Sequence, residues 1–376
     1  MQQPINRPAS APIYQSAGWI FRDLDEVDDV YENRVRGSVY GGSGSPNHWA
    51  LEAALCELHE APAALITAAG MSAFTAALLS LARVGTHVVA AHDLYGNTTR
   101  LLQDLQRFGV VTTLVDVSRH ADVRAGLAQP NSMLIVETIS NPRLQVADLG
   151  ALANLARESG ALLIVDNTLA SPYHCKPLSF GASAVVESIT KFLGGHHDLV
   201  LGSLLGSAEL IAAAKTTAGR AGLIGPSFES WLATRSLAEY SLRMERSSAN
   251  AQEIAAWLQG QPAVRRVHYP GLELSPSHAA AMATLQNGFG PVLSFEVNPD
   301  RQAVNRFLHA LQRIKLVLSF GGAETTLSHP GTSSHRALSR EAREQLGIHD
   351  GFLRLSVGVE DVADVIADLE RGLSAF

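Results

Sequence analysis

The sequence predicts an α/β protein in which a mostly parallel central sheet carries helices on both faces and a smaller C-terminal α+β domain follows. Short apolar runs alternate with helical segments between residues 63 and 206, which is typical of a buried parallel sheet. The pattern changes after about residue 235, where a long helical segment precedes further strands. The length of 376 residues also exceeds one ordinary compact core.

The first 48 residues are predicted to form an N-terminal arm. Pro, Gly and Ser interrupt any sustained period, an acidic run extends from Asp23 to Asp29, and residues 38–47 (SVYGGSGSPN) have the composition of a loop. Helical periodicity begins near Trp49, with Asn47 as the expected N-cap.

Residues 49–235 are predicted to form the domain that contains the large sheet. Its strands are expected at residues 63–67, 87–91, 111–115, 132–138, 161–167, 184–190 and 199–206. Helices are expected between the strands, one ending near residue 83 and others at 98–108, 121–128 and 149–159. Residues 236–376 form the predicted second domain, with helices at 241–259 and 360–373 and strands at 291–297 and 352–358.

Composition is typical of a soluble globular enzyme, and we expect a cytoplasmic protein. The chain is 46% hydrophobic and 17% charged, and its net charge of -7 comes with no Lys/Arg-rich run. This charge argues against nucleic acid or an anionic membrane as a partner. The N-terminal stretch lacks the features of a signal peptide, and no apolar run reaches membrane-spanning length.

Neither the cysteines nor the histidines predict a metal site. Cys56 and Cys175 are far apart in the sequence, which gives no zinc motif and favours a reducing compartment. The fourteen histidines are scattered, and the one tight group is His196-His197-Asp198. Adjacent side chains on a strand point to opposite faces, so this group suits a chelate poorly.

Two charged residues follow predicted strands where a ligand is expected. Asp166 follows the apolar run ALLIV, and Lys191 follows AVVESIT. A lysine that loses solvent becomes nucleophilic through a lowered pKa. A nearby aspartate can pair with a protonated pyridine nitrogen. Taken singly, each residue is more often a strand-end cap or a solvated surface charge.

Two further segments predict a phosphate site. Ser188 and Thr190 alternate with Glu187 and Ile189, so their hydroxyls are expected on one face of the strand that leads to Lys191. Ala69-Gly70-Met71 lies between a strand and a helix, where free N–H groups bind anions. Alone, this second segment is also compatible with a simple strand-to-helix turn.

Six segments in order resemble the Cys/Met-metabolism enzymes that depend on pyridoxal 5'-phosphate (PLP). The segments are AAGM (68–71), LYGNT (94–98), SNP (140–142), VDNT (165–168), SITKFLGGHHD (188–198) and RLSVG (354–358). The resemblance extends from about residue 11 to 373, and the Lys-centred segment is specific. It implies the type I fold of PLP-dependent transferases and PLP as the cofactor.

The resemblance implies cofactor-binding roles for the matching residues. Lys191 is the expected Schiff-base lysine and proton shuttle, and Asp166 is expected to hold the pyridinium nitrogen. Tyr95 is expected to stack on the cofactor ring and take part in catalysis. Asn141 is expected to contact the ring oxygen. The phosphate is expected to be held by Gly70, Met71, Ser188 and Thr190.

The resemblance also implies substrate contacts and an oligomer. Arg354 is expected to bind the substrate α-carboxylate through its planar guanidinium, and Ser319 is expected near the lysine and the substrate. Tyr40 is expected to reach a neighbouring subunit's site from the arm and to assist proton transfer. A homotetramer built from two such dimers follows from this resemblance.

The arm departs from the family pattern at Gly42. Family members usually carry there an arginine that reaches the cofactor phosphate of a neighbouring subunit. Arg34 or Arg36 could replace this contact. The missing arginine also supports a rival interpretation, a non-catalytic or regulatory descendant of the fold.

Three further positions bear on the substrate, and they conflict. Arg100 matches a position where cystathionine-handling members often carry arginine, although it is equally compatible with a helix-surface cation. Leu318 stands where many γ-synthases and γ-lyases carry glutamate, which suits a smaller or less polar substrate. Asn97 replaces a cysteine typical of methionine γ-lyases.

We therefore expect cystathionine γ-lyase-like C–S elimination, which gives a 2-oxo acid, ammonia and a thiol. The alternative is γ-replacement, as in a cystathionine γ-synthase or an O-acetyl- or O-succinylhomoserine sulfhydrylase. Both reactions share an intermediate, so the sequence separates them poorly.

Overall fold

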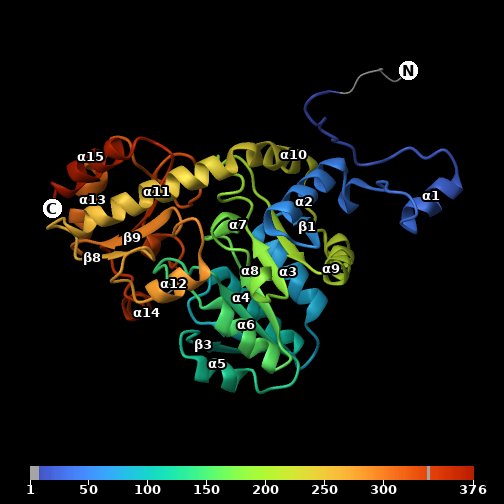
Figure 1. Cartoon of the computed structure of the whole chain (residues 1–376), viewed down its shortest axis with the longest axis horizontal. Helices are drawn as coiled ribbons and strands as arrows, with labels where there is room; N and C mark the ends of the chain where they lie inside the picture. The colour runs from blue at the N-terminus through green and yellow to red at the C-terminus, as the bar shows by residue number, and fades with distance from the viewer. Residues whose placement is uncertain (1–7, 337–338) are drawn as a thin grey trace.

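The computed structural model of the protein describes residues 8–336 and 339–376. Within these ranges the chain forms two sheets, one of seven strands and one of five. The N-terminal arm projects from the body beside the first sheet, and the second sheet lies at the opposite end of the molecule (Figure 1). No helix in the described ranges is long and apolar enough to cross a membrane.

The large sheet has the order β1-β7-β6-β5-β4-β2-β3. Its strands are β1 (Ala63–Thr67), β2 (His87–Ala91), β3 (Val111–Val115), β4 (Ser132–Glu137), β5 (Leu162–Asp166), β6 (Ala184–Glu187) and β7 (Gly202–Gly206). All neighbours pair in parallel except β7, which is antiparallel to both β1 and β6. The mostly parallel sheet expected from the sequence is thus confirmed.

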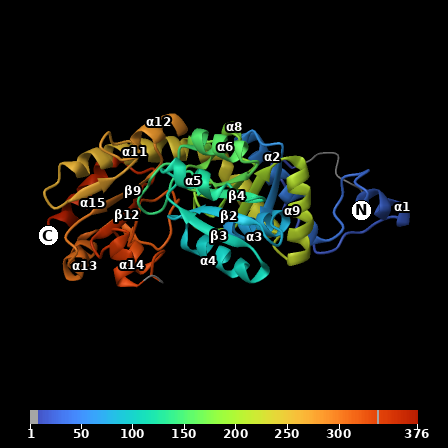
Figure 2. The ribbon, with the colours of Figure 1, turned by 90° about the horizontal axis from the view of Figure 1, so that it is seen from below.

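Helices cover both faces of this sheet. One face carries α2 (Pro46–His59), α5 (His120–Gly126) and α6 (Leu149–Glu158), and the other carries α3 (Gly70–Leu81), α4 (Gly96–Leu105) and α9 (Ala208–Ala221). Figure 2 shows strands β2–β4 between α6 and α4. Successive strand residues divide between the two cores: Leu134 packs with α6, whereas Ile135 packs with α3 and α4.

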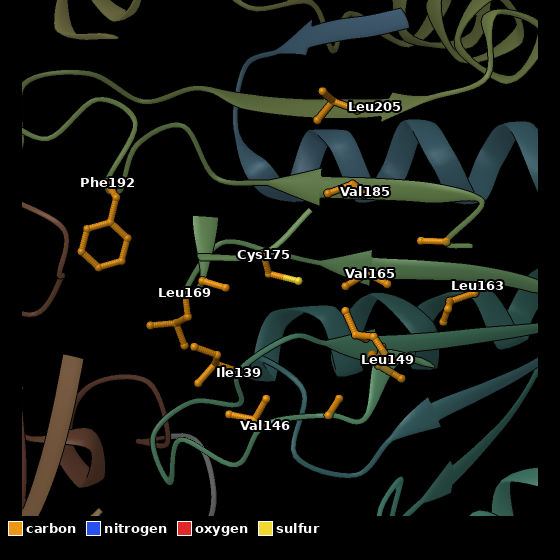
Figure 3. Packing of buried hydrophobic residues seen from close by; sticks show 14 of the residues in the cluster. Ile139, Val146, Leu149, Leu163, Val165, Leu169, Cys175, Val185, Phe192 and Leu205 are labelled. Atoms are coloured by element: carbon orange, nitrogen blue, oxygen red, sulfur yellow. The ribbon is translucent and has the colours of Figure 1, made fainter. Parts of the chain in front are cut away.

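Short helices and a long one continue the chain. They are α7 (Ser171–His174), α8 (Pro177–Phe180), α10 (Ser227–Ser236) and α11 (Tyr240–Gln259). Figure 3 shows the core on the α6 face, where Val165 and Val185 of neighbouring strands point toward Leu149 and Cys175. These side chains are at most 1% exposed, so this core anchors the ends of β5 and β6.

The second sheet has the order β10-β11-β12-β9-β8. Its strands are β8 (Arg266–His268), β9 (Val292–Glu296), β10 (Lys315–Leu316), β11 (Thr326–Ser328) and β12 (Phe352–Ser356). The accompanying helices are α12 (His278–Thr284), α13 (Arg301–Ala310), α14 (Arg340–Gln345) and α15 (Val362–Leu373). Residues of α11, α13 and α15 form one core with this sheet, which confirms the α+β character of the C-terminal region. The domain boundary expected at residue 235 lies in the last turn of α10.

The structure corrects three local expectations. Strand β6 ends at Glu187, so Ser188 and Thr190 lie in the following turn and share no strand face. The N-cap of α2 is Ser45, whose hydroxyl and N–H contact the His48 ring; Asn47 instead bonds the arm at Pro12 and Tyr14. The acidic run of the arm contains a helix, α1 (Leu24–Tyr31), capped by the Asp23 carboxylate.

Gly202 allows β7 to pass against the start of α3. A Cβ there would lie 2.3 Å from the carbonyl oxygen of Ala69 and 2.5 Å from the nitrogen of Gly70. We predict that Gly202→Ala destabilises the protein by about 1–3 kcal/mol, because backbone must move. Gly219→Ala is the matched control, because no atom lies within 4 Å of a Cβ at this position. In the interior of α9, alanine should stabilise the protein relative to glycine by roughly 0.5–1 kcal/mol. Urea unfolding midpoints measure both, and equal stability of the two variants would contradict the prediction.

Candidate active site

A cavity of about 620 Å³ lies at the carboxyl ends of the parallel strands. It is bounded by the turns after β1, β4, β5 and β6 and by residues 318–320 and β12 of the C-terminal region. Ten predicted site residues line it: Gly70, Met71, Tyr95, Asn141, Asp166, Ser188, Thr190, Lys191, Ser319 and Arg354. The carboxyl ends of parallel strands meet at one edge, which brings these distant segments together.

The amine of Lys191 faces the C-terminal region. Its Nζ donates a hydrogen bond of 2.8 Å to the Ser319 hydroxyl and lies 4.8 Å from the centre of the Phe320 ring. Burial, and then the positive charge of Arg354, lower the pKa of Lys191 to about 8. A fraction of the amine is therefore neutral and nucleophilic near neutral pH.

Two carboxyl groups lie side by side in the cavity. Glu137 and Asp166 are paired residues at the ends of β4 and β5. Burial raises the pKa of Asp166 to about 6, although two hydrogen bonds from Thr168 partly offset this effect by lowering the pKa. Burial and the neighbouring Asp166 charge raise the pKa of Glu137, which accepts a hydrogen bond of 2.5 Å from the Tyr95 N–H. A cationic group placed against Asp166 would keep that carboxylate ionised.

Arg354 presents a buried guanidinium to the cavity. It is 3% exposed, and its Nη1 donates a hydrogen bond of 2.7 Å to the Asn141 side chain. The guanidinium lies 4.9 Å from the centre of the Phe320 ring, the same ring that Lys191 faces. In the part of the chain that the structure describes, its Nε has no hydrogen-bond partner. This group can receive a carboxylate.

The start of α3 has the features of an anion site. Gly70 opens the helix, no side chain caps it, and the first-turn N–H groups are therefore left for a ligand. Ser188 lies directly beside it, because a Cβ on Gly70 would be 3.1 Å from the Ser188 Cβ. The Thr190 hydroxyl is already bonded to the backbone N–H and carbonyl of Leu201, each at 3.1 Å. Thr190 thus shapes the turn, while Ser188 has the freer hydroxyl.

Tyr40 and Arg100 do not line the cavity of their own chain. Tyr40 lies on the arm and is 63% exposed. The Arg100 guanidinium reaches the Asn97 side chain at 3.4 Å, and Asn97 donates to the Tyr95 hydroxyl at 3.1 Å. Arg100 is therefore linked to Tyr95 through Asn97, and its expected direct substrate contact is not supported within one chain.

Sequence reasoning missed several residues of the site. Glu137 lies next to last in the predicted strand 132–138, as Asp166 does in 161–167, so the rule that selected Asp166 would have selected it too. Asn167 bonds Thr138, Cys175 and Glu187 and thereby links the ends of β4, β5 and β6. Phe320 carried no signal, since its position between two cations arises only from tertiary packing.

Comparison with known proteins identifies the family. A family model described as Cys/Met metabolism PLP-dependent enzyme matches residues 2–374. The chain belongs to this family. An L-methionine gamma-lyase of Fusobacterium nucleatum subsp. polymorphum is 37% identical, with 96% of this chain and 92% of the relative covered. The cystathionine gamma-synthase of Escherichia coli K12 is 39% identical, with 91% and 89% covered.

Solved structures agree with this assignment. A cystathionine gamma synthase from Xanthomonas oryzae pv. oryzae, in complex with aminoacrylate and cysteine, superposes with a TM-score of 0.90. It is 36% identical, and the match covers 97% of this chain and 93% of that one. The family's cofactor is PLP, and the donor set of the cavity fits it: a partly buried amine, a strand-end carboxyl group and an uncapped helix start.

The pKa of Lys191 leads to a test on the PLP-free protein. Burial and Arg354 disfavour the protonated amine, so the reactive neutral form should dominate above about pH 8. We predict that the rate of Lys191 acetylation, measured by peptide mass spectrometry as a function of pH, reaches half its maximum at about pH 8. Arg354→Gln removes the neighbouring charge and should raise the midpoint. Arg100 lies outside the cavity lining, so Arg100→Gln should leave the pH midpoint unchanged. An unchanged midpoint in Arg354→Gln would refute the electrostatic account.

Proposed function

We propose that the protein catalyses PLP-dependent elimination of the γ-substituent from a sulfur-containing amino acid, with cystathionine as the preferred substrate. The observation that carries the proposal is the placement of Arg354 and Lys191 against one ring, Phe320, in a single cavity. A carboxylate bound to Arg354 would bring the amino acid's α-carbon toward the lysine amine. Relatives of this chain include a cystathionine gamma-lyase of Bacillus subtilis, 37% identical.

The proposed cofactor contacts follow from the cavity lining. Lys191 would attach PLP, Asp166 would hold its pyridine nitrogen, Asn141 would contact its ring oxygen, and Tyr95 would stack on the ring. Gly70 and Met71 at the start of α3, with Ser188 and Thr190 in the turn after β6, would hold the phosphate. When bound, PLP supplies an electron sink that stabilises negative charge on the substrate.

The chain's own residues perform the proton transfers. Arg354 holds the α-carboxylate and so directs the Cα–H bond toward Lys191. The Lys191 amine, whose pKa is about 8, takes the α-proton and returns protons along the substrate. Ser319 accepts a hydrogen bond from the amine and so positions it. The Phe320 ring contacts both the Lys191 amine and the Arg354 guanidinium.

The second candidate function is γ-replacement, in which a thiol takes the place of the γ-substituent on the same carbon. Leu318 lines the cavity and is 65% exposed, which offers an apolar surface to an incoming thiol. An O-succinylhomoserine sulfhydrylase of Pseudomonas aeruginosa is 35% identical. A non-catalytic role is disfavoured, because a buried lysine with a lowered pKa is costly to maintain without a use.

Product analysis tests the reaction. We predict that the PLP-loaded enzyme releases cysteine and 2-oxobutyrate from L-cystathionine, measured by chromatography and a ketoacid assay. Lys191→Ala should abolish release and also the visible absorbance of bound PLP. If cystathionine gives no 2-oxobutyrate, while an acylated homoserine and a thiol give a thioether, the enzyme catalyses replacement instead. Failure with all these substrates would refute both reactions.

We propose that the protein is a cytoplasmic homotetramer whose active sites are shared between subunits. The N-terminal arm is the basis for the sharing. It projects from the body in both views (Figures 1 and 2) and carries Tyr40 away from its own cavity. Gly42 offers no phosphate contact. Of the two suggested replacements, Arg34 pairs with Asp29 and Glu32 on the arm, and Arg36 stacks over Trp49 at 4.6 Å. Arg36 is therefore the better candidate.

Complementation tests this sharing. We predict that Tyr40→Ala lowers kcat by about 10²-fold, the range of a lost proton-transfer group, and that Lys191→Ala is inactive. Co-expression of the two variants should restore part of the activity, because a hybrid dimer contains one site with Tyr40 from one subunit and Lys191 from the other. No recovery in hybrids isolated by dual affinity tags would show that Tyr40 does not act across subunits.

A further inference from the structure

A second arginine, Arg336, lines the rim of the cavity together with Ser333 and Ser334. Its side chain is exposed, and among the described residues it forms no ion pair or side-chain hydrogen bond; its backbone N–H alone is bonded, to Ser333. Most other arginines near this segment are engaged: Arg340 pairs with Glu344, and Arg343 bonds the carbonyl of Gly331. Arg336 is thus a cation available to a ligand of the cavity.

The segment that carries Arg336 lies on the substrate side of the cavity. The carbonyl oxygen of Ser334 is 3.5 Å from where a Cβ on Gly96 would stand, so the segment lies over the residue that follows Tyr95. His335 is close enough to Arg354 to feel its charge. Burial, and then Arg354 and Arg343, lower the pKa of His335 to about 4, so this histidine adds no positive charge near neutral pH.

The cavity therefore offers two guanidinium groups in different settings. Arg354 is buried and receives the α-carboxylate under the proposed function. Leu318 and Arg336 line the same cavity and are both exposed, so an apolar side chain and a cation are available to a γ-substituent that extends outward from Arg354. Methylene groups of the substrate would pack on Leu318, and an anionic end group would pair with Arg336.

We propose that Arg336 is a specificity-determining residue that pairs with a carboxylate at the far end of the γ-substituent. The enzyme then favours substrates that carry a distal carboxylate, such as cystathionine or an O-succinyl ester of homoserine, over those without one, such as methionine or the O-acetyl ester. This inference rests on the proposed orientation of the substrate at Arg354. It assigns the distal contact to Arg336 instead of Arg100.

The test compares O-succinyl- with O-acetyl-L-homoserine, which share the reacting carbon and differ in the terminal carboxylate. For each enzyme we take the ratio of the two kcat/KM values. Arg336→Gln should lower this ratio about tenfold, mainly through the KM of the succinyl ester, as expected for a charge-assisted contact. Arg336→Lys should recover part of it. Arg340→Gln is the matched control on the same surface and should keep the wild-type ratio.

Each alternative outcome is decisive. An unchanged ratio in Arg336→Gln overturns the proposal, and a ratio that falls only in Arg100→Gln assigns the contact to α4. Weaker PLP binding in Arg336→Gln, measured by equilibrium dialysis, would mean that Arg336 serves the phosphate. If the enzyme converts neither ester, γ-replacement is refuted, and elimination is judged separately by the release of 2-oxobutyrate from cystathionine. The role of Arg336 is then tested by binding: the affinities of the two esters are measured by titration, with the visible absorbance of bound PLP as the signal.

Discussion

Three carboxyl groups with little exposure lie at the ends of the adjacent strands β4, β5 and β6. Glu137 and Asp166 line the cavity, with Asp166 partly buried, whereas Glu187 is buried outside the cavity lining. Burying these acids would be prohibitive without hydrogen bonds and positive charge. The Tyr95 N–H bonds Glu137, the Thr168 N–H bonds Asp166, and an amide bonds Glu187. These hydrogen bonds connect the acids to the surrounding turns, and the Asp166 carboxyl group in the cavity fits a cationic ring nitrogen.

Asn167 holds this row together. Its side-chain oxygen accepts from the Thr138 hydroxyl at 2.7 Å, and its amide donates to the Glu187 carboxylate at 2.8 Å and to the Cys175 carbonyl at 2.9 Å. Each partner belongs to a different segment of the site. Because loss of a buried partner costs about 1–3 kcal/mol, the ends of the three strands resist independent movement. The distance from Asp166 to the turn with Lys191 is stabilised in this way.

The C-terminal region completes the site and closes it. Arg354 on β12 reaches across to Asn141, and Ser294 on β9 donates to the Pro142 carbonyl at 2.8 Å. The loop with Phe320 can approach Lys191 only because Gly321 follows it: a Cβ there would lie 2.7 Å from the Lys191 carbonyl carbon, and its φ of +97° favours glycine. The two regions therefore share one catalytic cavity.

The sequence by itself determined the sheet, the family and most of the site. Strands β1, β2 and β3 begin and end where the apolar runs do, and Lys191, Asp166 and Arg354 were identified from local motifs, because burial and periodicity are local signals. Only the tertiary structure decided which side chains meet. Phe320 between two cations and Arg336 at the rim depend on contacts between segments far apart in the chain, and no local pattern records such contacts.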